Sequence, residues 1–266
     1  KLVKYVILVD DGSTDDTALV AHQEGAIVVS HYRQKGLAKA MYTGLAKALK
    51  YDTDIIFTTD ADGQYCAEDV PHLISALILE NADMVLGSRL KGNIERMASI
   101  KKIGNIAFTR ALRRMTGIPI SDGQTGFRAF KKEAVEEILP LMLPTFTYTQ
   151  QQLLIAGYLK LKVREIPITF RKREDGSSRL MSGPFSYAYK AWIALLVSYS
   201  FLNPRRFFVR IGFGILLVGL IGLSAIIPLS YVHKSIPLNL TIFIWMGLLG
   251  IFSGVQTIII GFVSRR

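Results

Sequence analysis

The stretch Asp54-Ile55-Ile56-Phe57-Thr58-Thr59-Asp60-Ala61-Asp62-Gly63-Gln64 decides the fold that we predict. Its apolar, β-branched first half is typical of a strand buried on both faces of a parallel sheet. Its second half places two carboxylates one residue apart, with a side-chain amide two residues later, where the chain leaves that strand. Mg²⁺ prefers oxygen ligands of this kind and shares its other positions between water and substrate phosphates. The motif predicts a metal site, although an isolated Asp-x-Asp is more often a solvated turn.

Strands and helices alternate on both sides of this stretch. We expect strands at residues 5–9, 26–30, 54–59, 83–86 and 163–170, and helices at 37–50, 67–81, 100–115, 132–139 and 150–159. A further helix is expected after Asp11, capped by Ser13 or Thr14 and closed by Gly25. This alternation predicts an α/β fold with a mainly parallel sheet flanked by helices.

Charged side chains follow several of the expected strands. Asp10 and Asp11 end the first strand, Asp60 and Asp62 follow the third, and Arg89 follows the fourth. Ligands of open α/β sheets bind outside the carboxyl ends of the strands. We therefore expect these side chains to converge on one edge of the sheet, which supports a site there over independent solvated turns.

Composition limits the classes of partner. The chain of 266 residues has a net charge of +11 and 50% hydrophobic residues. Such a charge suits nucleic acid, an anionic membrane surface or phosphorylated ligands, and the position of the basic residues near the apolar C-terminal segments favours the last two. Cys66 is the single cysteine, which excludes an intramolecular disulfide, and the four histidines lack zinc-ligand spacing.

The last quarter of the chain is typical of a membrane hairpin. Residues 211–232 and 236–264 contain no charged side chain, and each run exceeds the ~20 residues that cross a bilayer. We expect two transmembrane helices, the second starting near Leu238. Arginines flank the outer ends of the pair, whereas only Lys234 lies in the turn, so the positive-inside rule puts the α/β domain and both ends of the hairpin in the cytoplasm.

A segment rich in aromatic residues precedes this hairpin. Its apolar side chains recur at helical spacing and are Phe185, Tyr189, Trp192, Leu196 and Tyr199. The pattern fits an amphipathic helix at the membrane interface, or a helix that packs on the core. The predicted organisation is a cytoplasmic domain at 1–180, an interfacial helix region at 181–206 and a transmembrane hairpin at 207–266.

Five motifs occur in an order that resembles the family 2 glycosyltransferases. They are Asp10-Asp11-Gly12-Ser13-Thr14-Asp15, Lys35-Gly36-x-Ala38, Asp60-Ala61-Asp62-Gly63-Gln64, Gly87-Ser88-Arg89 and Asp122-x-Gln124-Thr125-Gly126-Phe127-Arg128. Within that family the chain is most similar to the polyprenyl-phosphate hexose synthases of the dolichyl-phosphate mannose synthase type. The resemblance covers about residues 3–180 and implies a GT-A-type, Rossmann-like domain.

The resemblance also implies a role for each motif. The donor nucleotide and its diphosphate would contact Asp10, Asp11, Lys35, Asp60, Asp62 and Arg89. Mg²⁺ or Mn²⁺ would be held by Asp60, Asp62 and Gln64. The acceptor phosphate would contact Gln124, Thr125, Arg128, Arg173, Ser178 and Arg179, the last three in a basic loop beside the membrane segment. Catalysis would rest on Asp62, Arg89 and Asp122, the last as a positioning residue.

The chain departs from the family pattern in three places. Lys101 stands where an arginine is frequent, and residues 150–152 are three glutamines where many relatives carry a glutamate. The strand expected ahead of Tyr5 is absent, so part of the nucleotide pocket is expected to be missing.

We predict that the protein transfers a hexose from a nucleoside-diphosphate sugar to a polyprenyl phosphate, with inversion and with a divalent metal. A phosphate monoester has a second pKa of about 6, so the acceptor can attack without a strong base. Two alternatives stay open: a membrane-anchored module that binds a nucleotide sugar or a partner without turnover, and a polysaccharide synthase. Neither tryptophan follows an arginine, which disfavours the synthase. Nucleic acid is not an expected partner, and the transmembrane helices could support a homo-oligomer.

Overall fold

The computed structural model describes residues 3–95, 99–143, 147–172, 184–232 and 238–264. The chain forms two compact units, Lys1–Ser198 and Tyr199–Arg266, and the boundary falls inside one helix, α7 (Pro184–Leu202). Each unit is described by itself.

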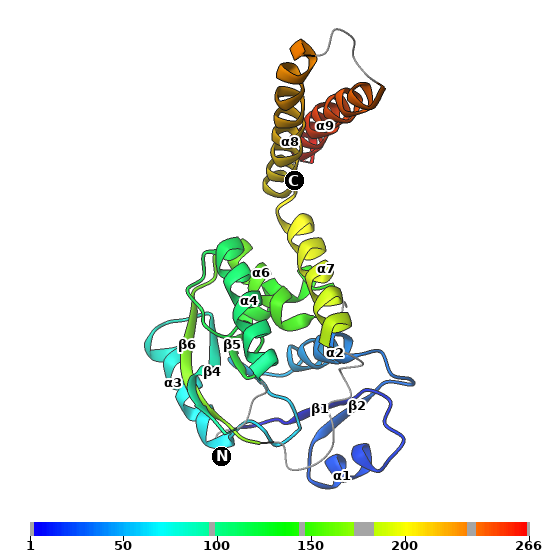
Figure 1. Cartoon of the computed structure of the whole chain (residues 1–266). Helices are drawn as coiled ribbons and strands as arrows, with labels where there is room; N and C mark the ends of the chain where they lie inside the picture. The colour runs from blue at the N-terminus through cyan, green and yellow to red at the C-terminus, as the bar shows by residue number, and fades with distance from the viewer. Residues whose placement is uncertain (1–2, 96–98, 144–146, 173–183, 233–237, 265–266) are drawn as a thin grey trace. The chain divides into compact units, whose positions relative to one another are not determined.

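The first unit contains two sheets. β1 (Ile7–Asp10) pairs in parallel with β2 (Ile27–Ser30), and α1 (Thr17–Gln23) connects them. The second sheet has the order β3-β5-β4-β6, formed by β3 (Ile55–Thr58), β5 (Arg128–Lys131), β4 (Met84–Ile94) and β6 (Val163–Phe170). Helices surround these strands, so the α/β class is confirmed (Figure 1).

The second sheet is mixed rather than mainly parallel, which corrects that part of the prediction. β4 and β6 are parallel, but β5 runs antiparallel to both of its neighbours, β3 and β4. The reason is the place where the chain enters the sheet to form β5. The first residue of β5, Arg128, pairs with Thr58, the last residue of β3. From there it can only run back along the sheet.

Helices cover both faces of this second sheet (Figure 1). α3 (Val70–Leu79), preceded by the 3₁₀ turn η1 (Ala67–Asp69), lies on one face, where Leu73 and Leu77 pack against Val85 and Phe127. α4 (Ser99–Thr116) and α6 (Tyr148–Tyr158) lie on the other face. The remaining helices of the unit are α2 (Leu37–Ala48), α5 (Lys132–Ile138) and the 3₁₀ turn η2 (Leu139–Leu141).

Several element boundaries differ from the prediction, among them those of α1, β4 and α6. α1 begins at Thr17 with Asp16 at its N-cap, so neither Ser13 nor Thr14 caps it, and the backbone N–H of Ser13 donates to Asp10. β4 continues to Ile94, well past residue 86, because a register shift between Ser88 and Asn93 lets it keep pairing with β6. α6 begins two residues before the predicted start at residue 150.

α7 packs on the first unit with one face and exposes apolar side chains on the other. The Trp192 ring stacks on Phe108 of α4 with 4.7 Å between centroids, and Gln151 of α6 donates to Ser198 at 3.3 Å. On the opposite face Tyr189 is 69% exposed and Leu196 37%. The prediction that these side chains form one face is therefore wrong for the described ones, because Trp192 points inward whereas Tyr189 and Leu196 point outward.

The second unit consists of two long helices, α8 (Pro204–Val232) and α9 (Leu238–Val263). They contain two segments long and apolar enough to cross a membrane, Pro204–Ser224 and Thr241–Val263, with mean hydropathies of 2.1 and 1.9. Glycines let the two backbones approach closely. A Cβ atom added at Gly254 would lie 2.6 Å from the backbone nitrogen of Leu216.

Candidate active site

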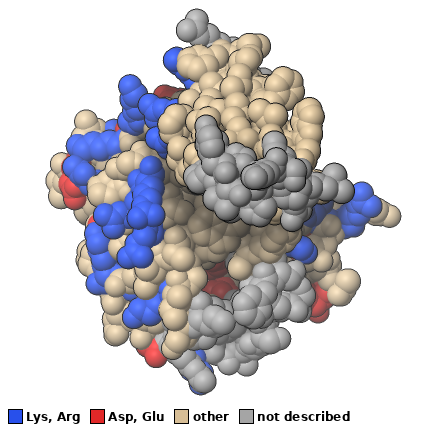
Figure 2. Space-filling view, turned by 45° about the horizontal axis from the view of Figure 1, so that its top comes forward, with Lys and Arg blue, Asp and Glu red and all other residues tan. Residues whose placement is uncertain are grey.

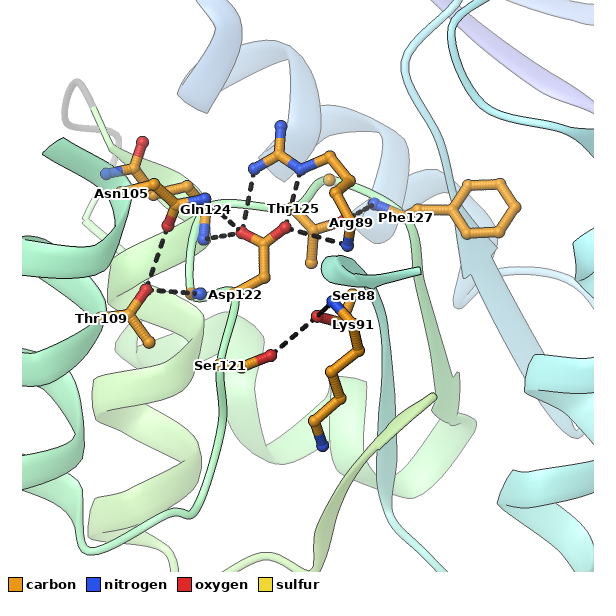
Figure 3. A network of polar contacts seen from close by, with 12 residues as sticks. Ser88, Arg89, Lys91, Asn105, Thr109, Ser121, Asp122, Gln124, Thr125 and Phe127 are labelled. Atoms are coloured by element: carbon orange, nitrogen blue, oxygen red, sulfur yellow. Dashed lines mark hydrogen bonds and ion pairs between the residues drawn. The ribbon is translucent and has the colours of Figure 1, made fainter. Parts of the chain in front are cut away.

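An ion pair between Arg89 and Asp122 forms the centre of the site (Figure 3). Arg89, in β4, donates from Nε to Asp122 Oδ2 at 2.7 Å and from Nη2 to Oδ1 at 2.9 Å. Its backbone N–H donates to Oδ2 at 3.1 Å. Burial alone would raise the pKa of Asp122, but the hydrogen bonds and the charge of Arg89 hold it below its usual range. Burial would likewise lower the pKa of Arg89, yet Asp122 raises it.

Asp122 acts on Arg89 and has no exposed surface of its own. Asn105 of α4 donates to its Oδ1 at 2.7 Å, and the backbone N–H of Gln124 donates to the same oxygen at 3.2 Å. Both carboxylate oxygens are therefore occupied by donors. A base must reach the proton that it abstracts, so this carboxylate is placed to orient Arg89 and not to remove a proton.

A second carboxylate fixes the backbone of the same loop. Glu165 of β6 accepts from the backbone N–H groups of Ser121 and Asp122 at 2.9 and 2.8 Å, and it pairs with Lys91 at 2.9 Å. Sequence reasoning missed both Asn105 and Glu165. A glutamate inside the largely apolar strand 163–170 was a usable signal for Glu165, whereas nothing in the sequence distinguished Asn105 on its helix.

The Asp60 carboxylate lies against the loop between Asp122 and Arg128. A Cβ atom added at Gly126 would lie 3.0 Å from Asp60 Oδ2 and 2.7 Å from the hydroxyl of Tyr148. Only a residue without a side chain fits between these groups. The turn after β3 and the loop before β5 therefore meet, whereas the convergence of Asp10 and Asp11 on the same edge stays a prediction.

Two tyrosines support this contact, the buried Tyr148 and the partly buried Tyr65. Tyr65 accepts from the backbone N–H of Gly126 at 3.1 Å, and its ring stacks on Phe127 with 4.9 Å between centroids. Burial raises the pKa of Tyr65 and raises that of Tyr148 well above its ordinary value. Both hydroxyls therefore stay protonated at neutral pH. The negative charge of Asp60 also raises the pKa of both hydroxyls.

The turn at residues 60–64 can supply part of a metal-binding site. Asp60 and Asp62 provide carboxylate oxygens from one partly exposed turn. Among the described residues, no group of three or more His, Cys, Asp and Glu side chains could hold a metal ion. Two carboxylates fit Mg²⁺ or Mn²⁺ if phosphate oxygens and water complete the coordination. Gln64 has another contact, since its Nε2 donates to the carbonyl of Arg171 at 3.2 Å and joins this turn to the end of β6.

Asp11 organises the loop that leads into α2. Its Oδ1 lies 2.7 Å from His31 Nδ1 and accepts from the backbone N–H of Lys35 at 2.9 Å, while Oδ2 accepts from Gly36 at 2.7 Å. Burial raises the pKa of Asp11, but the hydrogen bonds from His31, Lys35 and Gly36 together bring it below its usual range. The hydrogen bond from Ser13 lowers the pKa of the neighbouring Asp10.

Arg128 is buried beneath the loop of residues 122–127, which contradicts the prediction that its side chain contacts the acceptor phosphate. Its exposed fraction is 0%, and its guanidinium donates to protein oxygens. Thr125 is also fully buried, and its hydroxyl lies 3.4 Å from that of Tyr65, which contradicts a direct acceptor contact for its side chain. Gln124 is partly exposed. The side chain of Lys101 and the residues Arg173, Ser178 and Arg179 lie outside the described part of the structure.

Comparison with known proteins decides the family. The sequence model of Glycosyl transferase family 2 matches residues 2–139, slightly more than half of the chain. The chain belongs to glycosyl transferase family 2. The assignment made from the five ordered motifs is thereby confirmed, and so is the prediction that the protein is an enzyme, a glycosyltransferase.

Relatives of this family 2 glycosyltransferase include several named lipid-phosphate sugar transferases. An uncharacterized protein of Methanocaldococcus jannaschii is 36% identical over 66% of this chain and 74% of its own length. A UDP-N-acetylglucosamine–dolichyl-phosphate N-acetylglucosaminyltransferase of Methanococcus voltae is 31% identical over 61% of this chain and 73% of its own. An undecaprenyl-phosphate mannosyltransferase of Micrococcus luteus is 29% identical over 67% of this chain and 76% of its own.

Solved structures show the same fold for the glycosyltransferase domain. Glucosyl-3-phosphoglycerate synthase from Mycobacterium tuberculosis, in complex with Mn²⁺ and UDP-glucose, superposes with a TM-score of 0.52 at 21% identity. The match covers 74% of this chain and 68% of that one. The GT-A-like α/β fold is therefore confirmed.

Proposed function

We propose that the protein transfers a hexose from a nucleoside-diphosphate sugar to a polyprenyl phosphate at the cytoplasmic face of a membrane, with a divalent metal and with inversion at the anomeric carbon. The observation that carries the proposal is the contact between the Asp60 turn and the loop of residues 122–127, whose Asp122 binds Arg89 of β4. That contact brings the Asp60 carboxylate, a group of the kind that binds divalent metal ions, and the fixed guanidinium of Arg89 to the same edge of the sheet. Relatives whose names include dolichyl or undecaprenyl phosphate support the acceptor class.

The donor side of the reaction needs charge stabilisation. When the bond between the anomeric carbon and the donor phosphate breaks, negative charge develops on the nucleoside diphosphate that leaves. A divalent ion bound at Asp60 and Asp62 would act there as a Lewis acid. Arg89 adds a preorganised cation whose side chain is only 13% exposed, so it requires little reorganisation during the reaction.

The acceptor side needs a nucleophile that is already deprotonated. A polyprenyl phosphate is largely a dianion at pH 7, because the second pKa of a phosphate monoester is about 6. One of its oxygens forms the new bond to the anomeric carbon from the face opposite the leaving group, which inverts the configuration. The occupied oxygens of Asp122 agree with this scheme, since the reaction does not require a base at that position.

The charges and the apolar helices suit a reaction at a membrane. Figure 2 shows acidic side chains in a hollow and Lys and Arg side chains gathered along one flank of the face in view. We infer that the spans Pro204–Ser224 and Thr241–Val263 cross the membrane with both ends in the cytoplasm. The excess of arginine at those ends supports this orientation. We further propose that the predicted regions 1–180, 181–206 and 207–266 act as the catalytic domain, interfacial helix and anchor.

The test is a donor screen with membranes that contain the intact chain. Each common UDP- and GDP-hexose, labelled in the sugar, is incubated with polyprenyl phosphate and Mg²⁺ or Mn²⁺, and label is measured in the lipid extract. We expect one donor to give a labelled lipid whose anomeric configuration, determined by NMR, is opposite to that of the donor. Donor binding without lipid-linked product from any of these sugars would instead favour a binding module.

A further inference from the structure

Arg128 is a buried cation that contacts only neutral acceptors among the residues that the structure describes. Its guanidinium donates to the carbonyl oxygens of Thr125 at 2.8 Å, Thr149 at 2.9 Å and Gly123 at 3.2 Å. The remaining acceptor is Oε1 of Gln152 at 2.8 Å. Buried charges are usually paired with an opposite charge. Burial lowers the pKa of Arg128 to about 10, so it is still positive at neutral pH.

Gln152 is the one side chain, within the described part of the chain, that accepts a hydrogen bond from Arg128, so a carboxylate at this position could neutralise the cation directly. The side chain is fully buried in α6, with Oε1 facing Arg128. Its Nε2 faces Sδ of Met142 at 4.0 Å, and thioether sulfur is a weak acceptor. Among the described residues, no strong hydrogen-bond acceptor therefore faces Nε2, so this place does not require an amide group in preference to a carboxylate. A glutamate of nearly the same shape would form an ion pair with Arg128.

The charge of Arg128 lies directly beneath the site described above. The carbonyls of Gly123 and Thr125 that it binds belong to the same loop as Gly126, against which the Asp60 carboxylate lies. Arg89 and Asp122 neutralise each other within this layer. Asp60 adds one negative charge to this layer, and Arg128 adds one positive charge on the inner side of the loop, without a carboxylate among its hydrogen-bond partners.

We propose that Gln152 tunes phosphate affinity by leaving the Arg128 charge uncompensated, so that the loop from Asp122 to Arg128 presents additional positive potential to the phosphate groups of the substrates. The inference deepens the proposed function, because it concerns the same site and rests on substrates that carry phosphates. Gln152 acts through Arg128 and touches no substrate.

The expected magnitude follows from Coulomb's law. A unit charge roughly 10 Å from a phosphate group, at an effective dielectric constant of about 20, changes the binding constant about tenfold. The effect should be largest for ligands of high charge. Inorganic pyrophosphate with Mg²⁺ is therefore a suitable probe, and it needs neither a sugar nor a lipid acceptor.

The experiment compares Gln152→Glu with the matched control Gln152→Met in the full-length chain. Calorimetry measures the Kd for pyrophosphate in the presence of Mg²⁺, and thermal unfolding measures stability. Gln152→Glu should bind pyrophosphate about tenfold more weakly while its Tm is equal to or above that of the wild type, because Arg128 gains an ion pair. Gln152→Met should bind within about twofold of the wild type but unfold at a lower temperature, because Arg128 loses an acceptor.

Gln152→Glu thus loses affinity without losing stability, and Gln152→Met loses stability without losing affinity, a pattern that a general loss of structure cannot produce. Unchanged pyrophosphate binding in Gln152→Glu would overturn the inference. So would equal weakening in both variants, or a lower Tm for Gln152→Glu, since either result shows that the carboxylate does not compensate Arg128. Failure of the lipid-transfer assay would leave this comparison interpretable, because pyrophosphate binding requires no turnover.

Discussion

Replacing Asp122 with asparagine tests whether this residue positions Arg89 or contacts the substrate. The variant keeps the shape of the side chain but leaves Arg89 as an unpaired cation in a largely buried place. Breaking a buried ion pair by removing one partner costs about 3–5 kcal/mol. Because asparagine retains one acceptor oxygen, we expect the low end, about 3 kcal/mol. For a domain of this size that corresponds to a fall in Tm of about 6–12 °C.

The assay is thermal unfolding of the detergent-solubilised chain, measured together with sugar transfer. Glu80→Gln is the matched control, since Glu80 pairs with Arg164 at 2.7 Å but both side chains are about half exposed. Exposed pairs contribute about 0–1 kcal/mol, so the control should unfold close to the wild type. If Asp122→Asn loses transfer while its Tm stays within about 2 °C of the wild type, the positioning role is refuted and a direct contact with substrate must replace it.

The pH dependence of the same variant provides an independent check. The pKa of Asp122 is depressed in the folded state, so its contribution to stability is present above the unfolded value of about 3.9 and is lost as the pH falls through the lower folded pKa. Between about pH 5 and pH 2, the unfolding free energy of the wild type should fall more steeply than that of Asp122→Asn. If the curves of unfolding free energy against pH are parallel for the two proteins, the charged form of Asp122 does not stabilise the fold.

Three further predictions concern other parts of the chain. Gly126→Ala should lower transfer by at least about tenfold, because its Cβ would lie 2.7 Å from the Tyr148 hydroxyl and 3.0 Å from the Asp60 carboxylate, the predicted metal ligand. Gly104→Ala meets nothing within 4 Å and should stay fully active. Asp11→Asn should speed amide hydrogen exchange in a peptide spanning residues 31–40, and equal protection would contradict its role in that loop. Gly254→Leu should disrupt the helical hairpin and make it sensitive to protease in detergent, but Gly222→Leu should not.

Local patterns in the sequence predicted most of the elements, because apolar periodicity and turn residues are local properties. The strand 163–170 was predicted with the observed bounds, and the second long helix with its observed start at Leu238. The antiparallel entry of β5 could not be predicted, because strand direction depends on where a distant loop returns to the sheet. The extension of β4 to Ile94 likewise depends on pairing with β6, which lies far along the chain.

The sequence could predict a site residue when a charged side chain directly follows a strand. It could not predict a site residue whose role depends on whether its side chain is buried. Asp60 follows the end of β3, and that position by itself indicates a ligand site. Arg89 was predicted to follow a strand but lies inside β4, at the register shift between Ser88 and Asn93. Arg128 carries the same chemistry in the sequence but is fully buried, and only tertiary packing shows that it supports the loop from below. Tyr148 was missed for the same reason, since its hydroxyl differs from that of any other tyrosine only through its place beside Gly126.

The most direct test of the account is metal-dependent formation of a lipid-linked sugar by the wild type and by Asp62→Asn. With its nucleotide sugar, polyprenyl phosphate and Mg²⁺ or Mn²⁺, the wild type should form a labelled lipid, and both EDTA and Asp62→Asn should abolish the product while Tm changes little. Undiminished product in Asp62→Asn, or in the presence of EDTA, would contradict the placement of the metal and diphosphate at the turn of residues 60–64.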